Sequence, residues 1–181
     1  MENLRFYMVS ENYINYLRKF DTRIQISKEG NGSQPRKYIG VILKINNFNY
    51  FAPLSSYKEH PHDIHNERHD FIKITEDNPK NKYQKYAVLY LNNIIPVPKC
   101  ALIDFDFDED VDDANYSKLL KREYLVCKKK LNIIQKSAKI VYATQKNLPD
   151  SKLAKRCCDF SLLEEKCLDY ESAIETNENI K

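Results

Sequence analysis

The chain has 181 residues, of which 42% are hydrophobic, and its formal net charge is +3. This length fits one domain with a substantial core, and no apolar stretch approaches the roughly 20 residues that a membrane span requires. The first ten residues also lack the basic region and the cleavage site of a signal peptide. We therefore expect residues 1–181 to form a single cytoplasmic domain without a membrane anchor.

The first 103 residues predict a sheet with one helix. Residues 4–9 have the pattern of a short strand, and Ser10 is typical of the N-cap of a helix whose apolar side includes Tyr13 and Leu17. Residues 37–45 and 49–54 predict two strands joined at Asn46-Asn47 in a hairpin. Further strands are expected at 70–74 and 86–91. The prolines of residues 92–98 end the sheet, because proline cannot donate to a central ladder.

An acidic connection follows at residues 104–113, which hold seven acidic residues and no basic one. Phe105 and Phe107 alternate with aspartates there, which predicts an edge strand or a loop held by two rings. The segment lacks the glycine and the terminal glutamate of an EF-hand loop. The rest of the chain carries a net charge of +10 and all 13 tyrosines. Cations that bind phosphates and rings that stack on bases favour a single-stranded nucleic acid as partner.

Residues 114–175 predict a helical part. Apolar residues recur at steps of four and three from Leu120 to Val141, as in one amphipathic helix. A second helix is expected from about Ser151, because Pro149-Asp150-Ser151 is a helix start signal. The fold class is therefore α+β, with an antiparallel sheet followed by helices that pack on it.

No cofactor is expected. All four histidines lie between residues 60 and 69, and clusters of histidine and aspartate bind metals. However, only His65 and His69 have the i, i+4 spacing of helix-borne ligands, and Pro61 favours a loop, so we prefer a solvated loop. A metal-dependent phosphodiesterase is a weaker alternative, built on His60, His62, His65 and Asp70. The five cysteines form no C-x-x-C pair, which favours buried thiols in a reducing compartment.

The stretch from Ser55 to Lys58 has two interpretations. In one, Pro53 ends an edge strand and the two serines form an ordinary turn. In the other, these hydroxyls and Lys58 form a reactive corner. The hairpin favours the second, because it brings residues 54–58 close to Arg36, Lys37 and Tyr38. Such a group of cations and hydroxyls around one point suits a phosphodiester.

The chemistry that fits these residue types is metal-free RNA cleavage, in which the ribose 2′-OH attacks the adjacent phosphate. It requires a base for the 2′-OH, an acid for the leaving 5′-oxygen and cations for the charge that develops on the phosphorane. The products carry 2′,3′-cyclic phosphate and 5′-OH ends. The alternative from another class is a non-catalytic RNA-binding module that uses the same basic and aromatic surface.

Five segments together resemble the ToxN/AbiQ family, the endoribonuclease toxins of type III toxin–antitoxin systems. They are FYMVSENYINYLRKFD (6–21), PRKYIGVIL (35–43), YFAPLSSYK (50–58), NNIIPV (92–97) and RCCDFSLLEEKC (156–167). The length favours the AbiQ-like members. The resemblance implies a compact, twisted antiparallel sheet, related to the Kid/MazF toxin fold and surrounded by helices.

The resemblance also implies a function and partners. Members of the family cut RNA without a metal and take part in abortive defence against bacteriophage. A repeat-derived RNA pseudoknot is their antitoxin, which they process from its precursor and with which they assemble into protein–RNA rings. Without RNA, the toxin is expected to be a monomer.

The family's hydroxyl pair followed by x-Lys corresponds to Ser55, Ser56 and Lys58, and its basic residue corresponds to Arg36. The resemblance implies that Ser56 hydrogen-bonds the scissile phosphate or the 2′-OH, while Lys58 and Arg36 stabilise the phosphorane. The family's helix tyrosine corresponds to Tyr13, which either orients the substrate or fills the core.

Two departures from the family pattern concern the same region. Ser-Ser-Tyr-Lys stands where Thr-Ser-Pro-Lys is common, so Tyr57 is a candidate for stacking on a base. Arg36 is followed by Lys37 instead of proline, so either of these two cations can be the one that stabilises the phosphorane. Lys37, Tyr38 and Tyr57 are therefore the expected RNA-binding residues.

Overall fold

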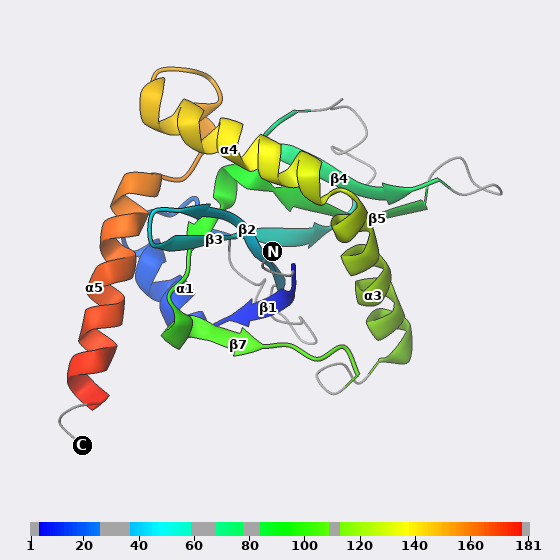
Figure 1. The fold of residues 1–181 in the computed structure, drawn as a ribbon, viewed down its shortest axis with the longest axis horizontal. Coiled ribbons are helices and arrows are strands. Elements are labelled where there is room, and N and C mark those ends of the chain that lie inside the picture. The colour runs from blue at the N-terminus through cyan, green and yellow to red at the C-terminus, as the bar shows by residue number, and fades with distance from the viewer. Residues whose placement is uncertain (1–3, 26–36, 59–67, 78–83, 109–112, 179–181) are drawn as a thin grey trace.

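The computed structural model describes residues 4–25, 37–58, 68–77, 84–108 and 113–178. Figure 1 shows a central sheet with helices around it. The strands are β1 (Phe6–Val9), β2 (Lys37–Ile45), β3 (Phe48–Ser56), β4 (Phe71–Glu76), β5 (Gln84–Tyr90), β6 (Ile95–Pro96) and β7 (Leu102–Asp104). The helices are α1 (Glu11–Arg18), α3 (Ala114–Lys129), α4 (Leu131–Asn147) and α5 (Phe160–Glu178).

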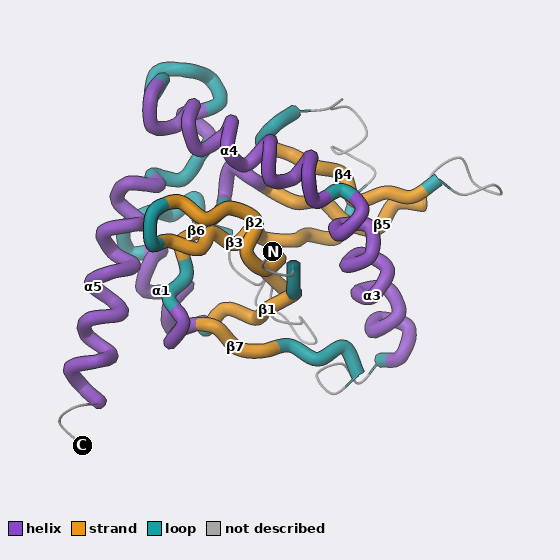
Figure 2. The backbone as a smooth tube through the Cα atoms, in the orientation of Figure 1, coloured by secondary structure: helices purple, strands orange, loops and turns teal. Residues whose placement is uncertain are grey.

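All strand pairs are antiparallel, in the order β4-β5-β3-β2-β1-β7, and β6 also pairs with β3. Helix α3 packs beside β4 and β5, α4 crosses β2, and α5 packs on α1 and β6 (Figure 2). The predicted α+β class, with an antiparallel sheet and a helical C-terminal part, is confirmed. β3 lies near the middle of the sheet, with β2 along one edge as far as Pro53 and β6 and then β5 along the other.

The predicted hairpin is confirmed. β2 and β3 are joined at Asn46-Asn47, and Asn46 has a φ of 52°. This left-handed conformation is one that asparagine tolerates better than most residues. The tight turn aligns the two strands, so that the start of β2 meets the far half of β3.

β1 and β2 approach closely at Gly40, whose amide donates to the carbonyl of Arg5. A Cβ atom at residue 40 would lie 2.8 Å from the backbone nitrogen of Arg5. Because backbone atoms yield little, Gly40→Ala is expected to lower the free energy of unfolding by roughly 1–3 kcal/mol or more, as measured by urea unfolding. Asn47→Ala in the exposed turn is the control, with an expected change within about 0.5 kcal/mol. A Gly40→Ala protein as stable as the wild type would contradict this close approach.

The single amphipathic helix predicted between Leu120 and Val141 is wrong, because two helices divide this region at Lys130. Lys130 has a φ of −93° and a ψ of 6°, and its Nζ donates to the carbonyl of Lys73 on β4 at 2.8 Å. The break lets α3 and α4 point in different directions around the sheet (Figure 1). The predicted apolar face is nevertheless buried on both sides of the break, at Cys127 and Ile134 for example.

The second helix begins at Phe160, not near Ser151 as predicted. The Ser151 hydroxyl accepts a hydrogen bond from the amide of Ala154 at 3.1 Å, and only one 3-10 turn (Ala154–Arg156) begins there. Asp159 caps α5 instead, because its carboxylate accepts from the amide of Leu162 at 3.1 Å. After this turn the chain is extended at Cys157, and the amide of Cys158 donates to the carbonyl of Asn92 at 2.9 Å.

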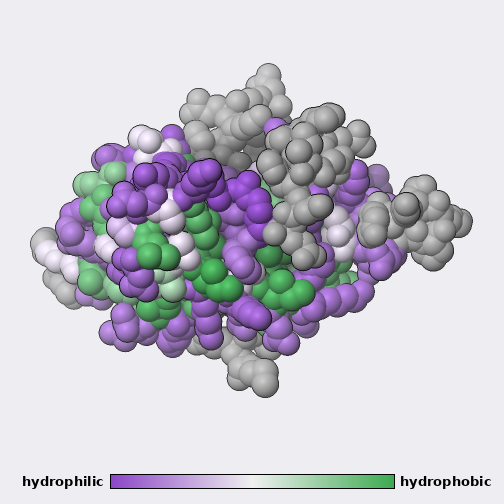
Figure 3. All heavy atoms as spheres, turned by 90° about the horizontal axis from the view of Figure 1, so that it is seen from above, coloured by the Kyte–Doolittle hydropathy of each residue, from purple (hydrophilic) through white to green (hydrophobic). Residues whose placement is uncertain are grey.

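One hydrophobic cluster joins the sheet to the helices. At its centre the hydroxyl groups of Tyr50 on β3 and Tyr142 on α4 donate to Glu164 on α5, at 2.6 and 2.7 Å. Four of the five free cysteines are buried, as expected for small hydrophobic residues. No helix in the described ranges combines the length and apolar character of a membrane span. Figure 3 shows hydrophilic residues mixed with separate hydrophobic patches over the α4 side.

Candidate active site

The stretch from Ser55 to Lys58 lies where β3 changes its neighbours. β2 pairs with β3 as far as Tyr38 and Pro53. Beyond Pro53, β3 pairs with β5, and the partners of Ser55 and Ser56 are Val88 and Ala87. Among the described residues, no strand pairs with the second edge of β3 after Pro53.

The interpretation of the two serines as a turn is wrong, because both belong to β3. The expectation that both hydroxyls surround one point also needs correction. Successive side chains of a strand point to opposite faces, so Ser55 and Ser56 lie on the two sides of β3. Ser56 is exposed and Ser55 is half-buried. A bound RNA strand can contact both hydroxyls only by passing over the end of the strand.

Tyr57 and Lys58 extend the same edge. The amide of Tyr57 donates to the carbonyl of Tyr86 at 3.2 Å, which keeps this residue beside β5. The Nζ of Lys85 lies 5.4 Å from the centre of the half-buried Tyr57 ring, within cation–π distance. Lys58 is exposed. The corner therefore combines a hydroxyl, an aromatic ring and two cations.

The predicted approach of the two hairpin ends is confirmed for the backbone. Tyr38 pairs with Pro53, which places Lys37 and Tyr38 beside the start of the Ser55–Lys58 stretch. Arg36, the other predicted cation, lies outside the described residues. The catalytic and RNA-binding roles of these residues stay predictions.

Tyr13 does not lie at this corner. Its side chain is fully buried, its hydroxyl donates to the carbonyl of Pro96 at 2.6 Å, and its ring packs edge-on against Tyr170 at 4.8 Å. Burial raises the pKa of Tyr13 above its usual value, so the hydroxyl stays protonated at neutral pH. Of the two interpretations given above for Tyr13, this environment favours the core.

Tyr13→Phe is expected to lower the free energy of unfolding by roughly 1–3 kcal/mol, because the buried carbonyl of Pro96 loses its donor. The rate of RNA cleavage by the folded variant should not change. Tyr16→Phe on the same helix is the matched control, since that tyrosine is half-buried. Loss of cleavage by a Tyr13→Phe protein that remains folded would return Tyr13 to the active site.

Sequence reasoning missed a chain of polar side chains that leads from the core to Ser55. Ser55 Oγ lies 3.5 Å from Gln25 Oε1, and Gln25 Nε2 lies 3.3 Å from Asn93 Oδ1. Asn93 is 6% exposed, and its Nδ2 donates to the carbonyl of Arg23 at 2.8 Å. The one signal in the sequence was a pair of asparagines within the otherwise apolar run YLNNIIPV.

The buried carboxylate of Asp21 holds the residue to which this chain is anchored, Arg23. Asp21 binds the guanidinium of Arg23 through both oxygens, at 2.8 and 2.9 Å, and also accepts from the amide of Asp159. Burial alone would raise the pKa of Asp21, but these donors outweigh it and hold the pKa below its usual value. The neighbouring Cys158 thiol has a pKa raised by burial to about 12, so it stays neutral.

Asp70 has the same kind of environment. Burial favours its neutral form, but Arg68 and Arg156 each donate two bonds to its carboxylate, which lowers its pKa. Asp70 thus belongs to an ion-pair cluster and is a poor metal ligand. The described part of the chain has no group of three metal-ligating side chains. His60, His62 and His65, the other residues of the metal alternative, lie outside it.

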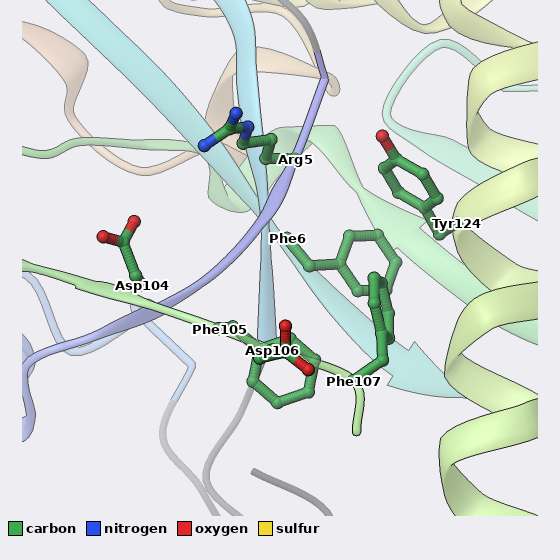
Figure 4. Close-up of a pocket in the computed structure, with 7 residues that line it drawn as sticks. All are labelled: Arg5, Phe6, Asp104, Phe105, Asp106, Phe107 and Tyr124. Carbon is green, nitrogen blue, oxygen red and sulfur yellow. The ribbon is translucent and has the colours of Figure 1, made fainter. Parts of the chain in front are cut away.

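A pocket of about 590 Å³ opens between β1, the segment after β7 and α3 (Figure 4). The rings of Phe6, Phe107 and Tyr124 pack together on one side of it. These contacts confirm that rings anchor the acidic segment, which begins on edge strand β7. Asp104 and Asp106 also line the pocket, and their charges disfavour a phosphate backbone.

Comparisons with known proteins agree with the fold. A family model for the toxin ToxN of type III toxin–antitoxin systems matches residues 5–168. The chain is 32% identical to the endoribonuclease ToxN of Bacillus thuringiensis subsp. kurstaki, over 99% of this chain and 91% of that protein. It is 34% identical to the endoribonuclease AbiQ of Lactococcus lactis subsp. lactis, over 92% of this chain and 89% of that protein.

Two solved structures are similar along nearly the whole chain. One is from a study of selective inhibition of type III toxins by a non-coding RNA pseudoknot, with a TM-score of 0.80 and 30% identity over 94% of this chain and 99% of that chain. The other is AbiQ, a lactococcal anti-phage endoribonuclease, with a TM-score of 0.78 and the same identity and coverage. The chain therefore belongs to the ToxN toxin family of type III toxin–antitoxin systems, as its sequence motifs indicated.

Proposed function

We propose that this protein is an endoribonuclease toxin of a type III toxin–antitoxin system, active in the cytoplasm in defence against bacteriophage. Relatives named as endoribonucleases, one of them anti-phage, support this activity. The observation that carries it is the position of Ser56 and Lys58, both exposed at the end of β3, beyond Pro53, the last β3 residue that pairs with the described part of β2.

The proposed reaction is a transesterification that needs no metal. The ribose 2′-oxygen attacks the adjacent phosphorus and loses its proton to a base. The bond from phosphorus to the 5′-oxygen breaks, and an acid protonates that oxygen. Ser56 hydrogen-bonds the phosphate, while Lys58 and Arg36 stabilise the charge on the phosphorane and supply the acid or base. Lys37, Tyr38 and Tyr57 hold the RNA strand on either side.

The proposed partner is a repeat-derived RNA pseudoknot that inhibits the toxin, which processes this antitoxin and assembles with it into protein–RNA rings. The support is a related structure from a study of pseudoknot inhibition. Exposed lysines on α4, among them Lys136 and Lys139, offer further phosphate contacts outside the active corner. Without RNA, the toxin is proposed to be a monomer.

The test is cleavage of RNA by the purified protein in the presence of EDTA, followed by analysis of the product ends. Activity should persist, and the products should carry 2′,3′-cyclic phosphate and 5′-OH ends. Cleavage that requires a divalent ion would instead support the metal alternative. A folded protein that binds RNA and cuts none would be a non-catalytic RNA-binding module.

A further inference from the structure

Two arginines converge on one buried carboxylate outside the active corner. The side chain of Asp70 is 6% exposed, whereas those of Arg68 and Arg156 are 35% and 44% exposed. Nη2 of each arginine lies 2.9 Å from the same oxygen of Asp70, so these two nitrogens are at most twice that distance apart. The cluster therefore holds two positive charges and one negative charge, and the positive charges are the ones that solvent reaches.

The second arginine exceeds what the buried carboxylate needs. One guanidinium already neutralises Asp70, and the other brings a like charge close to the first, which costs free energy. Each guanidinium has five N–H donors, of which Asp70 takes one at Nε and one at Nη2. Among the described residues, no hydrogen bond uses the remaining donors of Arg68 and Arg156. The pair thus lacks one negative charge and has donors left for an anion.

One 3-10 turn, η1 (Leu91–Asn93), fixes the place of this cluster. The amide of Leu91 donates to the carbonyl of Asp70 at 3.0 Å. Nδ2 of Asn92 donates to the carbonyl of Arg156 at 3.1 Å. The backbones that carry the carboxylate and one of the two guanidiniums are therefore both bonded to the same short turn.

The same turn lies close to the active corner. η1 directly follows β5, on which Val88 pairs with Ser55. Leu91 is three positions beyond Val88, which corresponds to about 10 Å along an extended chain. A strand of RNA bound at the corner can therefore bring a neighbouring phosphate to the two arginines.

We propose that Arg68 and Arg156 form a clamp for one backbone phosphate of the RNA strand that passes the active corner, at a nucleotide other than the one that is cut. This inference rests on the proposed function. A phosphodiester carries the one negative charge that the clamp lacks, and arginine binds phosphate oxygens through parallel hydrogen bonds. Because Asp70 holds both guanidiniums before the RNA arrives, binding costs little side-chain freedom. A phosphate contact positions the strand and reads no base, so the clamp adds affinity without sequence preference.

The test measures how the affinity for RNA depends on salt. The ligand is a single strand of mixed sequence in which fluorine replaces every 2′-OH, so the proposed reaction cannot cut it. Dissociation constants are measured by fluorescence anisotropy at several KCl concentrations for the wild type, Arg68→Gln and Arg68→Lys. Arg122→Gln is the matched control, because it removes an exposed arginine from α3. Thermal unfolding checks the folding of each variant.

Arg68→Gln should bind the strand roughly tenfold more weakly than the wild type, because it loses a hydrogen bond to a charged group. The slope of log Kd against log salt should fall by about 0.7, the value for one phosphate of a single strand. Arg122→Gln should keep the wild-type slope and affinity. Arg68→Lys keeps a cation beside Asp70, and so the slope, but it cannot form parallel bonds and should bind roughly threefold more weakly.

A folded Arg68→Gln protein with the slope and affinity of Arg122→Gln would overturn the clamp, even if the wild type cuts RNA in the EDTA assay. If Arg68→Gln does not fold, Arg68→Lys decides, and wild-type affinity in that variant would overturn the clamp as well. A wild type that binds no RNA would instead overturn the proposed function together with the clamp.

Discussion

Replacing Ser56 with alanine is expected to slow RNA cleavage at saturating RNA by roughly 10²–10³-fold, the usual effect of removing one hydrogen bond to a charged transition state. The hydroxyl is exposed at the end of β3, so its loss creates no cavity and leaves no buried group unsatisfied. The affinity for uncleavable RNA and the thermal stability should therefore change little. This combination separates a catalytic serine from one that only forms part of the sheet.

Ser172→Ala on the exposed surface of α5 is the matched control and should cut RNA at the wild-type rate. The measurement is a single-turnover cleavage rate in EDTA, with thermal unfolding of each variant as a check on folding. If Ser56→Ala cuts as fast as the wild type, the active corner does not include Ser56. If it cuts slowly only because it binds RNA weakly, Ser56 is a binding residue instead.

Most strands followed from local pattern, but the prediction that the prolines of residues 92–98 end the sheet is wrong, because β6 (Ile95–Pro96) pairs with β3 and β7 (Leu102–Asp104) pairs with β1. β-branched and aromatic runs separated by turn residues placed β2, β3, β4 and β5 within a few positions of their observed bounds. Asn46-Asn47 predicted the hairpin because the conformation at such a turn depends on the residues in it. Pro53 misled the interpretation of the residues after it. The strand continues through this proline, whose missing N–H falls where the pairing with β2 ends.

The helix bounds depended on distant contacts and were predicted less well. Periodicity identified the buried face of α3 and α4, but neither a proline nor a glycine marks the break at Lys130. Its side chain bonds to the backbone of β4, a contact between residues 57 positions apart. Ser151 resembled a helix N-cap as much as Asp159 does. Only the hydrogen bond from the amide of Asp159 to the carboxylate of Asp21 distinguishes Asp159 from Ser151. This bond joins residues that are 138 positions apart.

The candidate site was predictable only in part, because some of its contacts join residues that are far apart in the sequence. Ser56 and Lys58 stand out because polar residues follow an apolar strand, and the hairpin brings this stretch beside the backbone of Lys37 and Tyr38. Gln25 and Asn93 are 68 positions apart and lie in separate segments, so no local spacing connects them. A sequence motif does not show whether a side chain is buried. Tyr13 therefore matched the family pattern although its hydroxyl donates to the carbonyl of Pro96 inside the core.

The second large expected effect is a pH dependence of the free energy of unfolding, which arises from the buried carboxylate of Glu123. Glu123 lies on α3, which packs against β4 and β5, and is 4% exposed. Within the described ranges its carboxylate has no ion-pair partner, and its neighbours Cys127 and Tyr116 bring no positive charge. Burial alone raises the pKa of Glu123 to about 7. The folded protein therefore keeps a proton there that the unfolded chain releases near pH 4.5, the ordinary value for glutamate.

The free energy of unfolding should therefore fall as the pH rises between these two values, by roughly 3 kcal/mol from this group alone, and level off above about pH 7. Glu123→Gln removes the charge but keeps the shape, so its advantage over the wild type should grow by about that amount between about pH 5 and about pH 8. Urea unfolding at the two pH values measures it, with the exposed Glu175→Gln as control. Equal pH dependence in all three proteins would mean that water reaches Glu123, and that α3 does not seal this side of the sheet in solution.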